Sequence, residues 1–169
     1  MAGISDLKIL VVDDNAHMRA ILVTMLKSLG VRHVAEAKDG GAAFAALARW
    51  PADIAFVDLL MHPMDGLEFT RRVRNTETSP NPYLPIVMIS SHADMTRVAA
   101  ARDTGVTEFL VKPVTGKAVI DRLNAVIYRP RDFIRADDYF GPNRRRVAGA
   151  SPLGRDRRAG AETDNVTEI

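Results

Sequence analysis

The sequence predicts an α/β protein with a doubly wound, five-stranded parallel sheet, built from five strand–helix repeats. Short apolar runs alternate with segments whose apolar residues recur at helical spacing. Few polar residues interrupt the runs, which is typical of strands buried on both faces of a parallel sheet with right-handed crossovers. The length of 169 residues fits one such domain with a tail, and it is too short for two domains of ordinary size.

The predicted elements follow one another along the first 128 residues. The strands share short apolar runs and cover residues 8–12, 33–37, 54–57, 86–89 and 108–111. The helices share amphipathic spacing and cover residues 18–29, 41–49, 67–74, 95–103 and 117–127. Gly30 is the predicted stop of the first helix, and Thr115 is the predicted N-cap of the last.

Composition excludes several classes of protein. Hydrophobic residues make up 47% and charged residues 26% of the chain, which argues against collagenous and wholly disordered proteins. Because the chain has no cysteine, a metal would need oxygen or imidazole ligands. No stretch approaches the roughly 18 apolar residues of a membrane span, and the N-terminus does not resemble a signal peptide. We therefore expect a cytoplasmic protein without a membrane partner.

Positive charge is concentrated after residue 128. Residues 1–128 carry 14 basic and 14 acidic side chains, whereas residues 129–158 carry nine arginines, four aspartates and no lysine. This contrast predicts one domain over residues 1–128 and an arginine-rich extension over residues 129–169 that is mostly disordered. A turn is expected at Gly141-Pro142. The extension also contains three clustered aromatic residues, Phe133, Tyr139 and Phe140.

Polar side chains follow four of the predicted strands. Asp13 and Asp14 follow the first strand, and Asp58 follows the third. Ser90 follows the fourth, and Lys112 follows the fifth. Functional groups in parallel sheets collect beyond the carboxyl ends of the strands, so we expect these side chains to meet at one edge.

Three converging carboxylates repel one another unless a divalent cation neutralises them. Mg²⁺ suits such a site because it prefers oxygen ligands and keeps positions open for a phosphate. If a carboxylate attacked a phosphoryl group, the ammonium of Lys112 and the hydroxyl of Ser90 could stabilise its oxygens. Each residue alone is also an ordinary helix cap or strand end, and the joint pattern is what favours a shared site.

Four segments of the chain read VVDDNAHMR, FVDLLMHPMDG, PIVMISSHAD and FLVKP. They resemble the signatures of CheY-like receiver (response regulatory) domains of two-component signalling, in order over about residues 6–127. The resemblance implies a flavodoxin/CheY-like fold and phosphorylation of Asp58 by a histidine kinase or phosphotransfer protein. It also implies Mg²⁺ as the cofactor, held by Asp13, Asp14, Asp58 and the backbone carbonyl of Leu60.

The same resemblance assigns roles around the phosphoryl group. Lys112 would pair with it, Ser90 would hydrogen-bond to it after a short shift, and Phe109 would be an aromatic switch. The face formed by the fourth helix, fifth strand and fifth helix would then change shape. Leu60 and His92 would tune the access of water, and we expect the bulky Leu60 to slow autodephosphorylation.

Two backbone features accompany these roles. Pro113 is expected to follow a cis peptide bond. In the segment Met61-His62-Pro63-Met64-Asp65-Gly66, the proline is displaced by one position from the family's usual turn, so the sequence leaves the conformation of this loop open.

The extension resembles the arginine-rich tails of CheY-like proteins that bind cyclic di-GMP and act at bacterial flagellar motors. Guanidinium groups bind phosphates bidentately and stack on bases. The resemblance implies that six arginines bind the nucleotide: Arg144, Arg145, Arg146, Arg155, Arg157 and Arg158. Because no DNA-binding domain follows, we expect no sequence-specific DNA binding, and we expect output by contact with a downstream protein such as the motor.

Three alternatives stay open from the sequence. The chain could be a stand-alone phosphate sink or adaptor receiver whose basic tail binds nucleic acid nonspecifically. A Mg²⁺-dependent aspartyl phosphatase would normally need an Asp-x-Asp pattern and a capping segment, and neither is evident. A degenerate receiver would have lost Asp14, Asp58 or Lys112, and all three are present. We therefore expect a signalling switch and not an enzyme.

Overall fold

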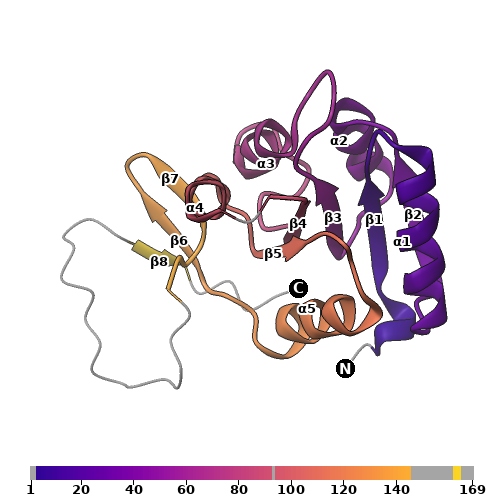
Figure 1. Cartoon of the computed structure of the whole chain (residues 1–169). Helices are drawn as coiled ribbons and strands as arrows, with labels where there is room; N and C mark the ends of the chain where they lie inside the picture. The colour runs from indigo at the N-terminus through magenta and orange to yellow at the C-terminus, as the bar shows by residue number, and fades with distance from the viewer. Residues whose placement is uncertain (1–2, 93, 146–161, 165–169) are drawn as a thin grey trace.

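Five parallel strands form the central sheet in the order β2-β1-β3-β4-β5. The computed structural model describes residues 3–92 and 94–145, together with the backbone of residues 162–164. The strands of the sheet are β1 (Lys8–Val12), β2 (His33–Ala37), β3 (Ile54–Asp58), β4 (Ile86–Ser90) and β5 (Glu108–Val111). Since every pairing in this sheet is parallel, the predicted fold class is confirmed (Figure 1).

Helices cover both faces of the sheet. After a short 3-10 turn at Ile4–Asp6, they are α1 (Ala16–Ser28), α2 (Gly40–Arg49), α3 (Gly66–Arg74), α4 (Met95–Thr104) and α5 (Gly116–Tyr128). The buried residues of α1 and α5 pack on one face, and those of α2, α3 and α4 pack on the other. Within the described part of the chain, no helix has both the length and the apolar character needed to cross a membrane.

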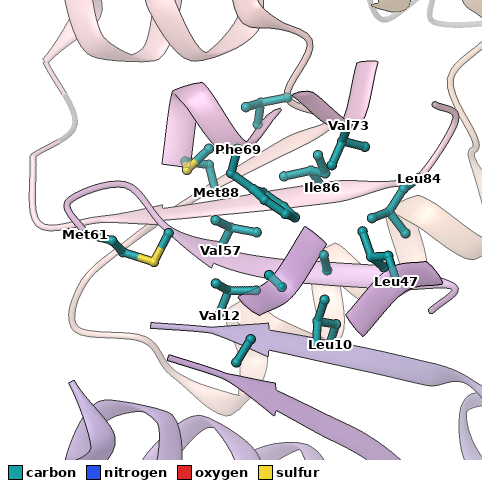
Figure 2. Packing of buried hydrophobic residues seen from close by; sticks show 14 of the residues in the cluster. Leu10, Val12, Leu47, Val57, Met61, Phe69, Val73, Leu84, Ile86 and Met88 are labelled. Carbon is teal, nitrogen blue, oxygen red and sulfur yellow. The ribbon is translucent and has the colours of Figure 1, made fainter. Parts of the chain in front are cut away.

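The alternation of strand side chains divides the core into two layers. In β1, Ile9 and Val11 point to the α1–α5 side, whereas Leu10 and Val12 point to the α2–α3–α4 side. Figure 2 shows the second layer, with Phe69 of α3 lying among side chains of several strands. The carboxyl ends of the strands are thereby fixed against a packed core.

The ends of the helices agree with the caps that the sequence predicts. Thr115 Oγ1 accepts a hydrogen bond from the backbone N–H of Ala118 at 3.1 Å. Gly30 has a φ of 97°, the left-handed conformation that ends α1 and that glycine adopts without strain. Both predictions are confirmed.

Residues 133–142 form a β-hairpin that the sequence did not predict. Strand β6 (Phe133–Ala136) pairs with β7 (Tyr139–Pro142), and β8 (Glu162–Asp164) pairs with the other side of β6. The expected turn at Gly141-Pro142 is wrong, because both residues lie in β7. Proline is tolerated there since β7 is an edge strand. A Cβ on Gly141 would lie only 2.7 Å from Tyr139 Oη and 3.1 Å from the Cα of Gly105.

The hairpin packs against the sheet domain through aromatic rings. The ring of Phe133 lies 5.1 Å from that of Tyr83 and 5.6 Å from that of Phe140, measured between centroids. Phe133 also faces the guanidinium of Arg74, which is 5.0 Å from its ring centroid. Arg74 is buried and donates hydrogen bonds to the carbonyls of Gly105 at 3.0 Å and Leu84 at 2.7 Å. Figure 1 shows the hairpin beside α4.

Replacing the central ring of this contact should weaken the whole domain. We expect Phe133→Ala to lower the free energy of unfolding by about 3 kcal/mol, because it removes a buried ring and leaves a cavity beside Arg74. Chemical denaturation of the full chain measures the change. The exposed Tyr128 provides a matched control, since Tyr128→Ala should cost under about 0.5 kcal/mol. Equal losses in the two variants would contradict the structural role of the hairpin.

Candidate functional site

Three carboxylates and one ammonium group meet at the carboxyl edge of the sheet. Each of Asp13, Asp14 and Asp58 places an oxygen within 4.8 Å of the others. Asp58 is the last residue of β3, and Lys112 follows β5 across the sheet. Lys112 Nζ lies 3.2 Å from Asp58 Oδ1. The structure therefore brings together four of the residues that the sequence placed at strand ends.

Local hydrogen bonds position the acids that follow β1. The backbone N–H of Asn15 donates to Asp13 Oδ1 at 2.9 Å, and Arg19 Nη1 donates to the Asp13 carbonyl at 2.8 Å. Asp14 Oδ2 accepts a hydrogen bond from the backbone N–H of His62 at 3.3 Å. The last of these contacts joins the loop after β1 to the loop after β3.

Burial and mutual repulsion act on the two inner acids. Asp13 is 8% exposed and Asp58 is 7% exposed. Burial raises the pKa of the Asp58 carboxyl, the charge of Asp13 raises it further, and Lys112 opposes both effects. Burial also raises the pKa of Asp13, against the N–H of Asn15 and the charge of Lys112. Since one ammonium does not balance three carboxylates, the site would be stabilised by a cation.

The spacing of the oxygens suits a small divalent ion. Two ligands at about 2.1 Å from Mg²⁺ are at most roughly 4.2 Å apart. The 4.8 Å limit of the acid cluster is close to this distance, so a slight inward movement or one bridging water would let all three acids act together. The donor set is hard oxygen, as Mg²⁺ requires.

Ser90 lies at the end of β4 beside this cluster. Its side chain is buried, and its Oγ accepts a hydrogen bond from the backbone N–H of His92 at 3.1 Å. The backbone N–H of Lys112 donates to the Ser90 carbonyl at 2.9 Å, which connects the ends of β4 and β5. Ser90 and Lys112 are thus fixed relative to one another by the backbone.

The remaining predicted residues differ in exposure. The side chain of Leu60 is 59% exposed, and His92 is exposed as well. Phe109 is half-buried and packs on the α2–α3–α4 side of the core. The ring therefore has core on one side and a more open region on the other.

The peptide bond between Lys112 and Pro113 is cis, as predicted. The bond between His62 and Pro63 is also cis, which the sequence did not predict. In the same loop, the backbone N–H of Gly66 donates to the Leu59 carbonyl at 2.9 Å. The displaced proline is therefore accommodated within a loop that returns to β3.

The sequence indicates no more for Gly66 than a break between two elements, and the structure shows a specific reason for this glycine. A Cβ at this position would lie 2.6 Å from the carbonyl oxygen of Asp58 and 3.1 Å from the Cα of Leu59. Only glycine lets α3 begin this close to the strand that carries Asp58. The sequence signal was the glycine that follows Asp65, the N-cap of α3.

The predicted nucleotide-binding arginines are only partly covered by the structure. The guanidinium of Arg144 lies 4.2 Å from the Tyr139 ring centroid, and its Nη1 lies 3.4 Å from Asp103 Oδ1. Arg145 is exposed. The other four lie outside the described residues: Arg146, Arg155, Arg157 and Arg158.

Comparison with known proteins agrees with the fold. Residues 9–124 match the model of the response regulator receiver domain family. The chain is 32% identical to the chemotaxis protein CheY-3 of Vibrio cholerae over 124 residues, which are 73% of this chain and 94% of that protein. It is 32% identical to the chemotaxis protein CheY of Pseudomonas aeruginosa over 123 residues, which are 73% of this chain and 98% of that protein.

Solved structures give the same result. The chemotaxis protein CheY4 of Vibrio cholerae superposes with a TM-score of 0.66 and 28% identity, covering 72% of this chain and 98% of that chain. The receiver domain of a Pseudomonas aeruginosa sensor histidine kinase, with magnesium coordinated in its active-site cleft, gives a TM-score of 0.62 and 27% identity. That match covers 70% of this chain and 94% of the other.

The fold and the acidic strand ends define a domain of the receiver class. This chain belongs to the response regulator receiver domain family and is similar to chemotaxis proteins of the CheY type.

The close approach at Gly66 leads to a stability prediction. We expect Gly66→Ala to lower the free energy of unfolding by about 1–3 kcal/mol, because the added methyl group must push α3 away from β3. Chemical denaturation measures the change. Gly116→Ala is the matched control, since no described atom lies within 4 Å of a Cβ there, and it should be neutral or slightly stabilising. A neutral Gly66→Ala would contradict the close packing of α3 on Asp58.

Proposed function

We propose that this chain is a phosphorylation-dependent signalling switch that accepts a phosphoryl group on Asp58 from a histidine kinase or a phosphotransfer protein. One observation supports this most directly. Asp58 is buried in a cluster with two further carboxylates, and Lys112 Nζ lies 3.2 Å from its Oδ1. A reactive carboxylate, an acidic cation site and a neutralising ammonium are the groups that phosphoryl transfer to an aspartate needs.

In the proposed reaction, an Asp58 oxygen attacks the phosphorus of the donor's phosphohistidine. The phosphorus–nitrogen bond breaks, its electron pair stays on the imidazole, and the imidazole nitrogen takes up a proton. Lys112 Nζ is close enough to Asp58 to pair with its carboxylate before the transfer and with the phosphoryl oxygens after it. When bound, Mg²⁺ would neutralise charge on the same oxygens.

Asp13, Asp14, Asp58 and the backbone carbonyl of Leu60 would hold the magnesium ion. The spacing of the three carboxylates supports this assignment. The magnesium coordinated in the active-site cleft of the similar Pseudomonas aeruginosa receiver domain supports it as well.

The conformational change would start at Ser90. In the structure, Ser90 Oγ accepts the N–H of His92, so its own O–H remains able to donate a hydrogen bond to a phosphoryl oxygen after a short shift. Movement of this loop would alter the packing around Phe109, which is only half-buried. The result would be a changed surface at α4, β5 and α5, which we call the output face.

The central test is phosphorylation of the full chain with a radiolabelled small phosphodonor and Mg²⁺. We expect Asp58→Asn to reduce incorporation to background, because it removes the attacking oxygen, and we expect a chelator to do the same to the wild type. Asp121→Asn is the control, since Asp121 lies on α5 and pairs with Lys117 at 3.0 Å. Retained labelling of Asp58→Asn would refute the assignment of the acceptor.

The exposed Leu60 gives a prediction on lifetime. The side chain is apolar and 59% exposed beside the acceptor strand, so it would keep water from the phosphorylated Asp58. We expect Leu60→Asn to speed the loss of label by about tenfold, because a polar amide would admit water that the leucine excludes; this is less than the roughly 100-fold or more of a positioned general acid or base. The decay is followed after removal of the donor. An unchanged or slower decay would contradict this role.

A second candidate function is the binding of cyclic di-GMP by the C-terminal extension, with output at a flagellar motor. The stacking of Arg144 on Tyr139 favours it, because this contact presents a guanidinium edge to a ligand. The similarity to chemotaxis proteins supports a motility role. The competing ligand of a basic tail is nucleic acid, bound without base preference.

Calorimetric titration of the full chain distinguishes these ligands. Cyclic di-GMP should bind saturably, and replacing both Arg144 and Arg145 by Gln should weaken binding at least about tenfold. The control is Arg72→Gln on α3, where Arg72 pairs with Glu68. If a random oligonucleotide bound more tightly and lost its affinity steeply with salt, nucleic acid would be the ligand and not the cyclic dinucleotide.

A further inference from the structure

A pocket of about 210 Å³ lies between the output face and the C-terminal extension. Arg102 of α4 and Arg122 of α5 line it from the sheet domain, and Phe109 of β5 lies on the same wall. Arg131, which precedes the hairpin, and Arg144, which follows it, line the pocket from the extension. The pocket therefore depends on the hairpin being packed in place.

The pocket carries more positive than negative charge. Its lining holds four arginines and one acid, Glu108. Arg122 and Arg131 lie 3.9 Å and 3.8 Å from the Glu108 carboxylate. Asp103, which does not line the pocket itself, lies 3.4 Å from Arg144 and 3.8 Å from Arg102. Among the described residues, two acids face four guanidinium groups, and the excess of positive charge is one that an anion would balance.

Arg131 has an N–H in this pocket that faces a carboxylate without a hydrogen bond to it, since its Nε lies 3.8 Å from Glu108 Oε1. Its Nε is buried and has no hydrogen-bond partner among the described residues. Its Nη1 is fixed by a hydrogen bond to the Asn143 carbonyl at 3.2 Å. Burial lowers the pKa of Arg131, although Tyr139 opposes this effect. A buried guanidinium N–H without a hydrogen bond favours the binding of a negatively charged acceptor.

We propose that this pocket binds a phosphate-type oxyanion, which bridges the arginines of α4 and α5 to those of the extension. Guanidinium groups from four segments offer donors on several sides, as a tetrahedral oxyanion with several acceptor oxygens requires. The bound anion holds the hairpin against the output face. The same chemistry occurs in free phosphate and in the phosphodiesters of a cyclic dinucleotide.

The Arg131 Nε–H gives a direct spectroscopic probe. We expect inorganic phosphate, added to the full unphosphorylated chain, to shift the Arg131 Nε–H resonance saturably in ¹⁵N–¹H spectra. Chloride at the same ionic strength should leave the resonance in place, and Arg131→Lys assigns it. A shift of equal size with chloride, or no shift with phosphate, would overturn the proposal.

Variants of the pocket test whether binding is local. Arg102→Gln should weaken phosphate binding about tenfold, because it removes one charge-assisted donor from a half-exposed side chain. Arg32→Gln is the control, since Arg32 is exposed and pairs with Asp6 outside the pocket. Equal losses in both variants would show general charge attraction and overturn the site. The phosphate-induced shift is expected to be unchanged in Asp58→Asn, so failure here is independent of the phosphoacceptor proposal.

Cyclic di-GMP in the same spectra distinguishes the two sources of the oxyanion. If the site serves a phosphodiester, cyclic di-GMP should move the Arg131 resonance at lower concentrations than inorganic phosphate. If it serves free phosphate, only inorganic phosphate should move it. Either result supports an oxyanion site. The proposal would be overturned if phosphate did not shift the Arg131 resonance and if cyclic di-GMP bound to the wild type and to Arg102→Gln with the same affinity.

Discussion

The convergence of three carboxylates at one buried edge is the constraint on which the site depends. Parallel strands end side by side, so Asp13 and Asp58 are brought together by the sheet itself. Burial and repulsion raise the pKa values of both acids, and the single ammonium of Lys112 offsets only part of this cost. A domain that keeps such an arrangement has an energetic reason to bind a cation and to respond strongly when a further charged group is attached to Asp58.

Packing around this edge leaves little freedom for β3, the strand that ends at Asp58. The first turn of α3 touches the backbone of Asp58 at Gly66, and the loop between them is joined to Asp14 through the N–H of His62. On the other side, the ends of β4 and β5 are connected through the backbone of Ser90 and Lys112. These contacts join Asp58 to its surroundings on both sides, and Phe109 on β5 is half-buried. Under the proposed function, a change of charge at Asp58 would act through them.

The hairpin covers part of the surface at which the proposed switch would act. It packs on the sheet domain through Phe133 and the buried Arg74, and β7 lies against α4. The surface formed by α4, β5 and α5 is thus partly covered by the chain's own extension. A partner of this face would meet the hairpin and the arginines around Phe109 together, which links the proposed switch and the proposed oxyanion site in one region of the molecule.

The sequence alone determined the parallel sheet, its helices and the acids at the strand ends, because apolar periodicity is local and parallel strands always place their carboxyl ends together. It also determined the caps at Gly30 and Thr115, which depend on neighbouring residues only. The tertiary structure decided the rest. Phe133 packs in the hairpin against Tyr83 and Arg74, which are distant from it in sequence. Gly66 is constrained by its close approach to the end of β3. Contacts of this kind have no periodic signal in a single sequence.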